Sequence, residues 1–373
     1  MKIAYDPQIF CAQIYGGVSR YFCELASRLA QQPDMDISIA APFYVNRYVK
    51  SIPSGVVKGF ACPKKNGFKS LYPRLIHRLL SLLVGDFILR SQFPDVVHET
   101  YFSPFPIGPR RARRVLTIYD MIHEKFPGDF PETDNTSKYK ALATRRADHV
   151  ICISESTRRD VIEILGIPPE KTSVIYLGFE LLKDHNHFEY EDSFQVDGSY
   201  LLFVGLRGGY KNFLRLLEAH ATSPYLRANF KLVCFGGGPF NSLELERISE
   251  LGLNTNQVIQ LGGSDTQLSQ LYSKATAFIY PSLYEGFGIP PLEAMSHDCP
   301  VICGHNSSIP EVVGDAGVYF ESTNLDSIRE TIERTVQSEP QRKILIEKGR
   351  ERLTYFSWDR CANETRAVYE NLL

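Results

Sequence analysis

The stretch that decides the fold is FIYPSLYEGFGIPPLEAM, residues 278–295. An apolar run ends at Pro281, which is typical of a buried strand in a parallel sheet. A loop with two glycines follows. Two consecutive prolines then suit the first turn of a helix, where a missing N–H costs least. The sequence therefore predicts a strand, a glycine loop and a helix in this order.

The loop and the helix start predict a binding site for phosphate. Glycine lets the backbone approach a ligand closely, and the first turn of a helix offers unpaired N–H groups. Two carboxylates flank the site, Glu285 before the glycines and Glu293 inside the first helical turn. Carboxylates accept hydrogen bonds from hydroxyls, so phosphate with a polyol predicts a nucleotide-sugar. Alternatively, Glu293 complements the helix dipole and Glu285 is a solvated loop residue.

The segment Glu285-Gly-Phe-Gly-Ile-Pro-Pro-Leu-Glu293 resembles the E-x7-E signature of retaining glycosyltransferases of family 4, which have the GT-B fold. Pro300–Cys303 and Ser308–Gly317 are also similar to that family. The resemblance covers most of the chain and is looser between residues 45 and 95. It implies an enzyme that moves a sugar from a nucleotide diphosphate to an acceptor hydroxyl with retention at the anomeric carbon.

Length and composition limit the class of protein. A chain of 373 residues suits two domains, and 43% hydrophobic with 23% charged residues is typical of a globular protein. The net charge of -2 gives no global basic field for nucleic acid. The 8 cysteines form no C-x-x-C pair and mostly lie in apolar runs, which indicates buried thiols in a reducing compartment and no metal site.

The first residues enter a strand directly and lack the apolar region of a signal peptide, and no run is long enough to span a bilayer. We therefore expect a cytoplasmic protein. A basic amphipathic stretch over 58–90, with the arginines of 110–114, suits contact with the inner face of an anionic membrane. The same pattern also suits a core-facing helix with a solvated face.

Strands and helices alternate through both halves, which predicts an α/β protein with two doubly wound parallel-sheet, Rossmann-like domains. We expect a first domain over residues 1–180, a polar linker over 181–199 and a second domain over 200–356, with the domains facing across a cleft. The resemblance implies that a helix over 357–373 packs back on the first domain.

Gly16 and Gly17 lie between a strand and a helix, an arrangement that binds ligands in doubly wound sheets but also occurs in ordinary tight connections. The resemblance places them at the cleft. Ser154 is expected to cap a helix. Relatives have a similar serine at the cleft.

Asp120 follows an apolar strand where many relatives carry a His-Asp pair. This chain has Tyr119 at the histidine position and His123 three residues later. Either residue could take the histidine's role, or the role could be missing. Asp120 is then the acid expected to orient the acceptor hydroxyl.

Arg207 and Lys211 lie beside glycines at a strand-to-helix turn. They could be solvated loop cations, but the resemblance implies that they bind the donor diphosphate and stabilise its developing charge. Glycine loops after neighbouring strands would hold the base and ribose. The expected ligand-binding residues are Gly16, Gly17, Ser154, Arg207, Lys211, Gly262, Glu285, Gly286, Phe287, Gly288, Ile289 and Glu293. The expected catalytic residues are Glu285, Asp120, Arg207 and Lys211.

Within the family, the chain is similar to bacterial mannosyltransferase-like enzymes of O-antigen or capsule assembly. The expected donor is GDP-mannose or another GDP-linked hexose, with a UDP-sugar second, and the acceptor is a glycan or lipid-linked oligosaccharide. No D-x-D motif lies in a plausible loop, so we expect neither a metal nor another cofactor. The alternatives are a nucleotide-sugar-binding protein without turnover and an NAD-dependent oxidoreductase, whose G-x-G-x-x-G motif residues 16–20 do not supply.

Overall fold

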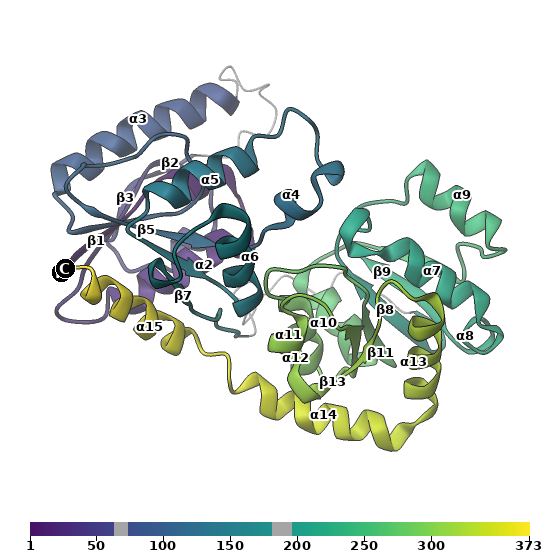
Figure 1. Ribbon diagram of the computed structural model, residues 1–373. Coiled ribbons are helices and arrows are strands. Elements are labelled where there is room, and N and C mark those ends of the chain that lie inside the picture. The colour runs from purple at the N-terminus through teal and green to yellow at the C-terminus, as the bar shows by residue number, and fades with distance from the viewer. Residues whose placement is uncertain (63–73, 181–195) are drawn as a thin grey trace. The chain divides into compact units, whose positions relative to one another are not determined.

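The computed structural model describes residues 1–62, 74–180 and 196–373 (Figure 1). Most of the predicted linker, 181–199, lies outside these residues. The chain forms two compact units, and the segment Lys125–Phe130 clusters with the second one although the predicted first domain contained it. Unit 1 comprises Met1–Glu124, Pro131–Gly178 and Ser357–Leu373, and unit 2 comprises Lys125–Phe130 and Phe179–Phe356.

Unit 1 is built on a parallel sheet with the strand order β3-β2-β1-β4-β5-β6-β7. Its central strands are short apolar runs that are buried on both faces, as parallel strands require. The strand order reverses between β1 and β4. The strands are β1 (Lys2–Tyr5), β2 (Asp36–Tyr44), β3 (Val57–Ala61), β4 (Val96–Glu99), β5 (Arg113–Ile118), β6 (His149–Cys152) and β7 (Thr172–Val174).

Helices cover this sheet, and α15 comes from the far end of the sequence to join them (yellow in Figure 1). Trp358 and Tyr369 of α15 are buried in the same apolar cluster as Ile3 of β1, and α15 packs on α2. The helices of unit 1 are α1 (Gln8–Ala12), α2 (Gly17–Leu29), η1 (Tyr48–Ser51), α3 (Arg74–Gln92), α5 (Thr136–Arg146), α6 (Glu155–Leu165), η3 (Pro169–Lys171) and α15 (Trp358–Asn371).

Unit 2 is built on a second parallel sheet with the strand order β10-β9-β8-β11-β12-β13. The order reverses between β8 and β11, and the carboxyl ends of the strands at such a reversal are where doubly wound sheets bind their ligands. The strands are β8 (Tyr200–Val204), β9 (Lys231–Phe235), β10 (Val258–Leu261), β11 (Ala277–Tyr280), β12 (Val301–Gly304) and β13 (Gly317–Phe320).

Helices again connect successive strands, so the predicted α/β class with two doubly wound, Rossmann-like domains is confirmed. None of the helices in the described ranges is both long and apolar enough to cross a bilayer. The helices are η2 (Pro127–Asp129), η4 (Gly209–Lys211), α7 (Phe213–Thr222), α8 (Pro224–Asn229), α9 (Ser242–Glu250), α10 (Asp265–Lys274), α11 (Ile289–Ser296), α12 (Ile309–Val313), η5 (Gly314–Ala316), α13 (Leu325–Gln337) and α14 (Glu339–Leu353). One more helix, α4 (Ile122–Lys125), has residues in both units.

Candidate active site

In unit 2, the loops that follow β8 and β11 meet where the strand order reverses. Lys211, at the end of η4, donates a hydrogen bond from Nζ to Oε1 of Glu285 at 2.7 Å. The two side chains are only 15% and 9% exposed. Doubly wound sheets bind their ligands at this position, in the crevice outside the carboxyl ends of the strands. The structure therefore brings together two of the predicted site residues at the expected place.

The next residue, Asn212, holds the loop of Lys211 in position. Its backbone is left-handed, with φ 57°, and its side-chain amide donates to the carbonyls of Pro281 at 3.1 Å and Ser322 at 2.8 Å. The ammonium of Lys211 also lies 5.7 Å from the ring centre of Tyr280. These contacts fix the cation beside the loop that carries Glu285, so Lys211 is not a solvated loop cation.

Two serines after β12 fix the backbone around Glu285. The N–H of Glu285 donates to Oγ of Ser307 at 2.8 Å, and Oγ of Ser308 lies within hydrogen-bonding distance of the carbonyls of Glu285 and Phe287. Burial and the neighbouring Glu285 carboxylate raise the pKa of Tyr280 well above its usual value. Glu285 is thus a mostly buried, fixed carboxylate, and its interpretation as a solvated loop residue is wrong.

The predicted strand, glycine loop and helix are confirmed. β11 ends at Tyr280, and α11 begins at Ile289 with the prolines in its first turn. Gly288 is the N-cap residue with φ 113°, a conformation that favours glycine. The buried ring of Phe287 packs against Phe356 with ring centres 5.6 Å apart. The chain from Gly286 to Ile289 is therefore anchored. Pro290 and Pro291 have no N–H, so the N–H groups without intrahelical acceptors at the start of α11 belong to Gly288 and Ile289.

Glu293 is the fifth residue of α11, one position beyond the first turn in which it was expected. A helix dipole acts mainly within the first turn, so the dipole interpretation of Glu293 is weakened. The hydroxyl of Tyr272, in α10, donates to Oε2 of Glu293 at 3.2 Å. Burial and the Glu293 carboxylate raise the pKa of Tyr272 well above its usual value. Tyr272 therefore acts as a donor that orients this carboxylate.

The guanidinium of Arg207 is engaged within the scaffold of unit 2. Its Nε donates to Oε1 of Glu244 at 2.8 Å, and its Nη2 lies 3.2 Å from Oε2. Three further contacts of 2.9–3.0 Å reach carbonyls of the loop after β9, those of Gly236, Gly238 and Pro239. The side chain is 3% exposed, so it is not a solvated cation. To reach a phosphate, the guanidinium would have to exchange some of these partners.

Sequence reasoning missed Glu244 as the partner of Arg207. Asn241 and Glu244 form a capping box at the start of α9, and the N-x-x-E pattern indicates such a cap. The pattern does not reveal that the same carboxylate holds an arginine 37 residues earlier. Phe240 completes the arrangement, because its ring centre lies 4.8 Å from the guanidinium carbon of Arg207.

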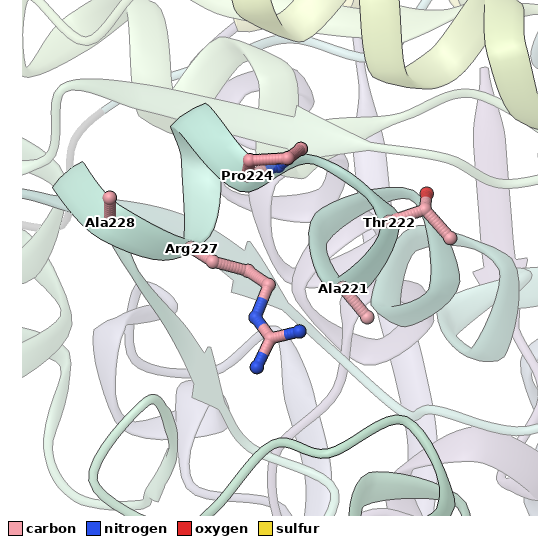
Figure 2. A pocket seen from close by; sticks show the side chains of 5 residues that line it. All are labelled: Ala221, Thr222, Pro224, Arg227 and Ala228. Atoms are coloured by element: carbon pink, nitrogen blue, oxygen red, sulfur yellow. The ribbon is translucent and has the colours of Figure 1, made fainter.

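Gly262 is exposed in the loop between β10 and α10, at the same edge of the sheet as the other donor-site loops. A hollow of about 500 Å³ lies elsewhere in unit 2, at the turn between α7 and α8 (Figure 2). It contains none of the predicted site residues, and its single charged residue, Arg227, donates to the carbonyl of Gly252 at 2.9 Å. We therefore assign the site to the carboxyl edge of the sheet.

In unit 1, Asp120 follows β5 and is held by two contacts. Its Oδ1 accepts from the N–H of Ile122 at 3.0 Å and lies 3.8 Å from Nζ of Lys140. Lys140 is buried and also donates to Glu124 at 2.8 Å. The Asp120 side chain keeps 31% of its surface exposed. The structure thus presents Asp120 as a fixed carboxylate at the carboxyl edge of the first sheet.

The two candidates for the missing histidine lie in different surroundings. The ring of Tyr119 packs edge-on against Tyr21 with centres 5.9 Å apart, and its buried hydroxyl has no hydrogen-bond partner among the described residues. Nε2 of His123 lies 3.8 Å from Oδ2 of Asp134. Neither arrangement assigns the histidine's role.

Gly16 and Ser154 both occupy N-cap positions. Gly16 precedes α2, and a Cβ on it would collide with the side chain of Gln13. Gly17 is the first residue of α2 and faces open space. Oγ of Ser154 accepts from the N–H of Thr157 at 3.0 Å at the start of α6, which confirms the capping interpretation. Roles for Gly16, Gly17 and Ser154 toward a ligand stay predictions.

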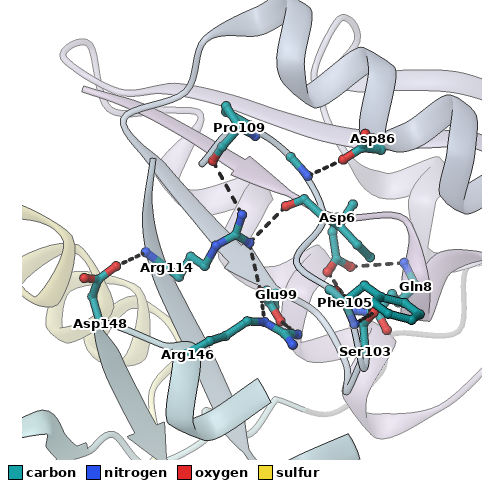
Figure 3. Close-up of polar contacts among 12 residues, drawn as sticks. Asp6, Gln8, Asp86, Glu99, Ser103, Phe105, Pro109, Arg114, Arg146 and Asp148 are labelled. Atoms are coloured by element: carbon teal, nitrogen blue, oxygen red, sulfur yellow. Dashed lines mark hydrogen bonds and ion pairs between the residues drawn. The ribbon is translucent and has the colours of Figure 1, made fainter. Parts of the chain in front are cut away.

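The predicted basic cluster over 110–114 is smaller than expected (Figure 3). Arg114 is buried and pairs with Glu99 at 2.9 Å, and Arg146 binds the same carboxylate. Arg113 pairs with Asp148 at 3.3 Å. The correction has a simple physical cause, since Arg113 and Arg114 belong to β5 and a strand alternates its side chains between two faces. Arg110 and Arg111 remain exposed.

Comparison with known proteins gives matches along most of the chain. Residues 15–181 match the family model described as Glycosyltransferase Family 4, and residues 189–352 match the model described as Glycosyl transferases group 1. O-antigen chain mannosyltransferase B of Escherichia coli is 28% identical over 379 residues, covering 95% of this chain and 96% of that protein.

Two solved structures show a similar fold over the whole chain. Sucrose-phosphate synthase of Thermosynechococcus elongatus superposes with a TM-score of 0.70 at 19% identity, covering 100% of this chain and 98% of that chain. HepE of Anabaena, solved in complex with UDP and glucose, gives a TM-score of 0.69 at 20% identity and covers 100% of both chains. At these identities the similarity concerns the fold.

Proposed function

Because the chain belongs to the glycosyltransferases of family 4, we propose that it transfers mannose from GDP-mannose to a glycan or lipid-linked glycan in the synthesis of a bacterial surface polysaccharide. The observation that carries this proposal is the Lys211–Glu285 pair where the strand order of unit 2 reverses, next to the glycine loop and the start of α11. The mannosyl specificity is supported by the similarity to the E. coli O-antigen enzyme.

The donor would lie along the carboxyl edge of the second sheet. Its diphosphate would meet the ammonium of Lys211 and the backbone N–H groups of 286–289, which favour negative charge. Glu285 would accept hydrogen bonds from hydroxyls of the mannose. Glu293, oriented by Tyr272, would accept hydrogen bonds from the ribose. The exposed loop at Gly262 would leave room for the base.

The chemical step breaks the bond between the anomeric carbon and the diphosphate oxygen, and the electron pair leaves with the diphosphate. Lys211 and the amides at the start of α11 would stabilise that charge as it forms. Asp120 would orient the acceptor hydroxyl, whose oxygen forms the new bond to the anomeric carbon while its proton passes to the departing diphosphate. We propose that the new bond keeps the anomeric configuration of the donor and that no divalent metal takes part.

A transfer assay tests the proposal. GDP-mannose should release GDP in the presence of extracted lipid-linked acceptor, and Glu285→Ala should abolish the release. Glu246→Ala, an exposed carboxylate of α9, is the matched control and should leave it unchanged. Nuclear magnetic resonance of the product should show the anomeric configuration of the donor, and a chelator should not slow the reaction. Failure of every GDP- and UDP-sugar to react would overturn the enzyme assignment.

A UDP-sugar is the second candidate donor. It is favoured by the fold shared with HepE, which was solved with UDP and glucose. Calorimetric titration of the protein with GDP and with UDP separates the two donors, because only the correct base should bind tightly. A lipid-linked acceptor is held in a membrane, so we also propose that the enzyme works on the inner face of the cytoplasmic membrane.

A further inference from the structure

Helix α3 turns large apolar side chains toward solvent. Leu79, Leu83 and Phe87 are 55%, 61% and 72% exposed. Their spacing of four residues places them along one side of the helix. The neighbouring side chains of Ile76, Leu80 and Val84 extend this surface, and each is more than a third exposed. We call these six residues the apolar face of α3.

The opposite side of α3 packs on unit 1 through small residues and through Leu89, which joins a buried core cluster with the partly buried Leu82 and Ile88 beside it. Ser81, Gly85 and Leu89 are buried and also follow one another at intervals of four. A Cβ on Gly85 would collide with the side chain of Pro7, so the helix lies too close to α1 for any larger residue there. Rotation of the helix to bury its apolar face would require that larger side chains enter this contact. The exposure of the apolar face is therefore built into the packing.

An ordinary surface helix exposes mainly polar side chains, whereas α3 exposes large apolar side chains in addition to those that it buries. The interpretation of α3 as a core-facing helix is confirmed for its inner side, where Leu89 joins a buried core cluster, but its outer side is more apolar than an ordinary solvated face. Contiguous exposed apolar surface of this kind marks an interaction site. Lys64, Lys65 and Lys69, which belong to the predicted basic stretch, lie outside the described residues.

The charges around the apolar face are mainly positive. Arg78 and Arg90 are exposed on α3. Asp86 is the one carboxylate among the described residues of this helix. It pairs with Arg90 at 2.7 Å and accepts a hydrogen bond from the N–H of Gly108 at 2.6 Å. Arg111 lies over the exposed ring of Phe93, just beyond the end of α3, with its guanidinium carbon 4.5 Å from the ring centre. Cations and aromatic rings beside an apolar helix face suit a lipid interface.

We propose that the apolar face of α3 is a membrane-docking surface that inserts into the interfacial layer of an anionic bilayer, with the helix lying in the membrane plane. The arginines at its edge are complementary to anionic head groups. In an isologous dimer, two copies of the same positively charged surface would meet, and the repulsion between them disfavours a second copy of the chain as the occupant. The attraction is mainly apolar, so binding should persist at high salt, where exposed charges are screened.

Vesicle flotation with the full chain tests this proposal. The variant Leu83→Glu/Phe87→Glu should bind vesicles of phosphatidylcholine and phosphatidylglycerol at least about tenfold more weakly than the parent, because each replaced side chain removes apolar contact. The control variant Leu243→Glu/Ile344→Glu replaces exposed apolar residues of α9 and α14 in unit 2, which are 73% and 52% exposed. It changes the net charge equally and should bind like the parent.

Three results would overturn the proposal. The first is equal binding by both double variants, and the second is complete loss of the parent's binding at high salt, which would indicate electrostatic adsorption alone. The third is a dimer of the parent, seen by light scattering without lipid, that the α3 variant dissolves. Thermal unfolding should show that both variants fold like the parent. Transfer to a water-soluble acceptor should be unaffected by the α3 variant, which separates failure of this proposal from failure of the proposed enzyme function.

Discussion

The ammonium of Lys211 and the carboxylate of Glu285 form an ion pair 2.7 Å long, although one residue follows β8 and the other follows β11. The pair is largely shielded from water, so each charge compensates the other while the site is empty. A negatively charged diphosphate would compete with Glu285 for Lys211. The hydroxyls of the sugar would then replace the ammonium as donors to Glu285. The same pair would therefore bind both parts of the donor.

Replacing Glu285 with glutamine should separate donor binding from transfer. The Lys211 ammonium loses its competing anion, so GDP should bind at least as tightly as to the parent protein, whereas transfer should fall by about 100-fold. Calorimetry gives the affinity and steady-state kinetics gives kcat. Lys211→Gln is the converse variant and should weaken GDP binding by about tenfold or more. Equal loss of GDP affinity in both variants would contradict the assigned roles.

Arg207→Lys should lower the free energy of unfolding by about 3 kcal/mol, because a buried ion pair loses its geometry and loop carbonyls lose their donors. Urea unfolding measures this change. Arg334→Lys offers a control at an exposed arginine of α13. If Arg207→Lys keeps the parent's stability yet no longer binds GDP, the main role of Arg207 is contact with the diphosphate and not support of the loop after β9.

Tyr272→Phe should raise KM for the donor several-fold, by roughly 1 kcal/mol of binding, with little change in kcat. The substitution removes only the hydroxyl that orients Glu293. Tyr225→Phe, which alters a tyrosine that is 36% exposed on α8, should leave both constants unchanged. A fall in kcat without a change in KM would place Glu293 in the chemical step and not in ribose binding.

His98→Gln should reduce the decrease in the free energy of unfolding that occurs at acidic pH. His98 is buried, and burial lowers its pKa from 6.5 to about 3. Below pH 6.5 the unfolded chain takes up a proton that the folded chain does not, so stability is full above 6.5 and is lost as pH falls toward 3. At about pH 5 the loss from this residue is about 2 kcal/mol. Glutamine cannot take up that proton.

The measurement is the free energy of unfolding of both proteins near pH 7 and near pH 5. Burial and the Glu99 carboxylate raise the pKa of Asp6 to about 6, which adds stability as pH falls through that value. Both proteins contain Asp6, so the difference between them isolates His98. Parallel pH profiles for the two proteins would show that His98 is not held neutral.

Local features of the site could be predicted from the sequence, and long-range pairings could not. Glycine and proline have the same backbone preferences in any sequence, so Gly288 and the prolines of α11 made the strand, loop and helix predictable. The Arg207–Glu244 pair depends on how the loops after β8 and β9 approach each other, and no residue pattern encodes that distance. For α3, periodicity predicted an amphipathic helix, but the contact of Gly85 with Pro7 decides which side is buried.

The position of α15 has a consequence for how the protein is made. Nδ1 of His98 lies 2.6 Å from the hydroxyl of Tyr369, and Trp358 is buried in the same apolar cluster as Ile3 of β1. A ribosome must synthesise all of Phe179–Phe356 before it reaches these side chains. Unit 1 therefore starts first and finishes last, and its apolar core lacks the side chains of α15 while unit 2 emerges and folds. During that interval, the growing polypeptide should depend most on chaperones.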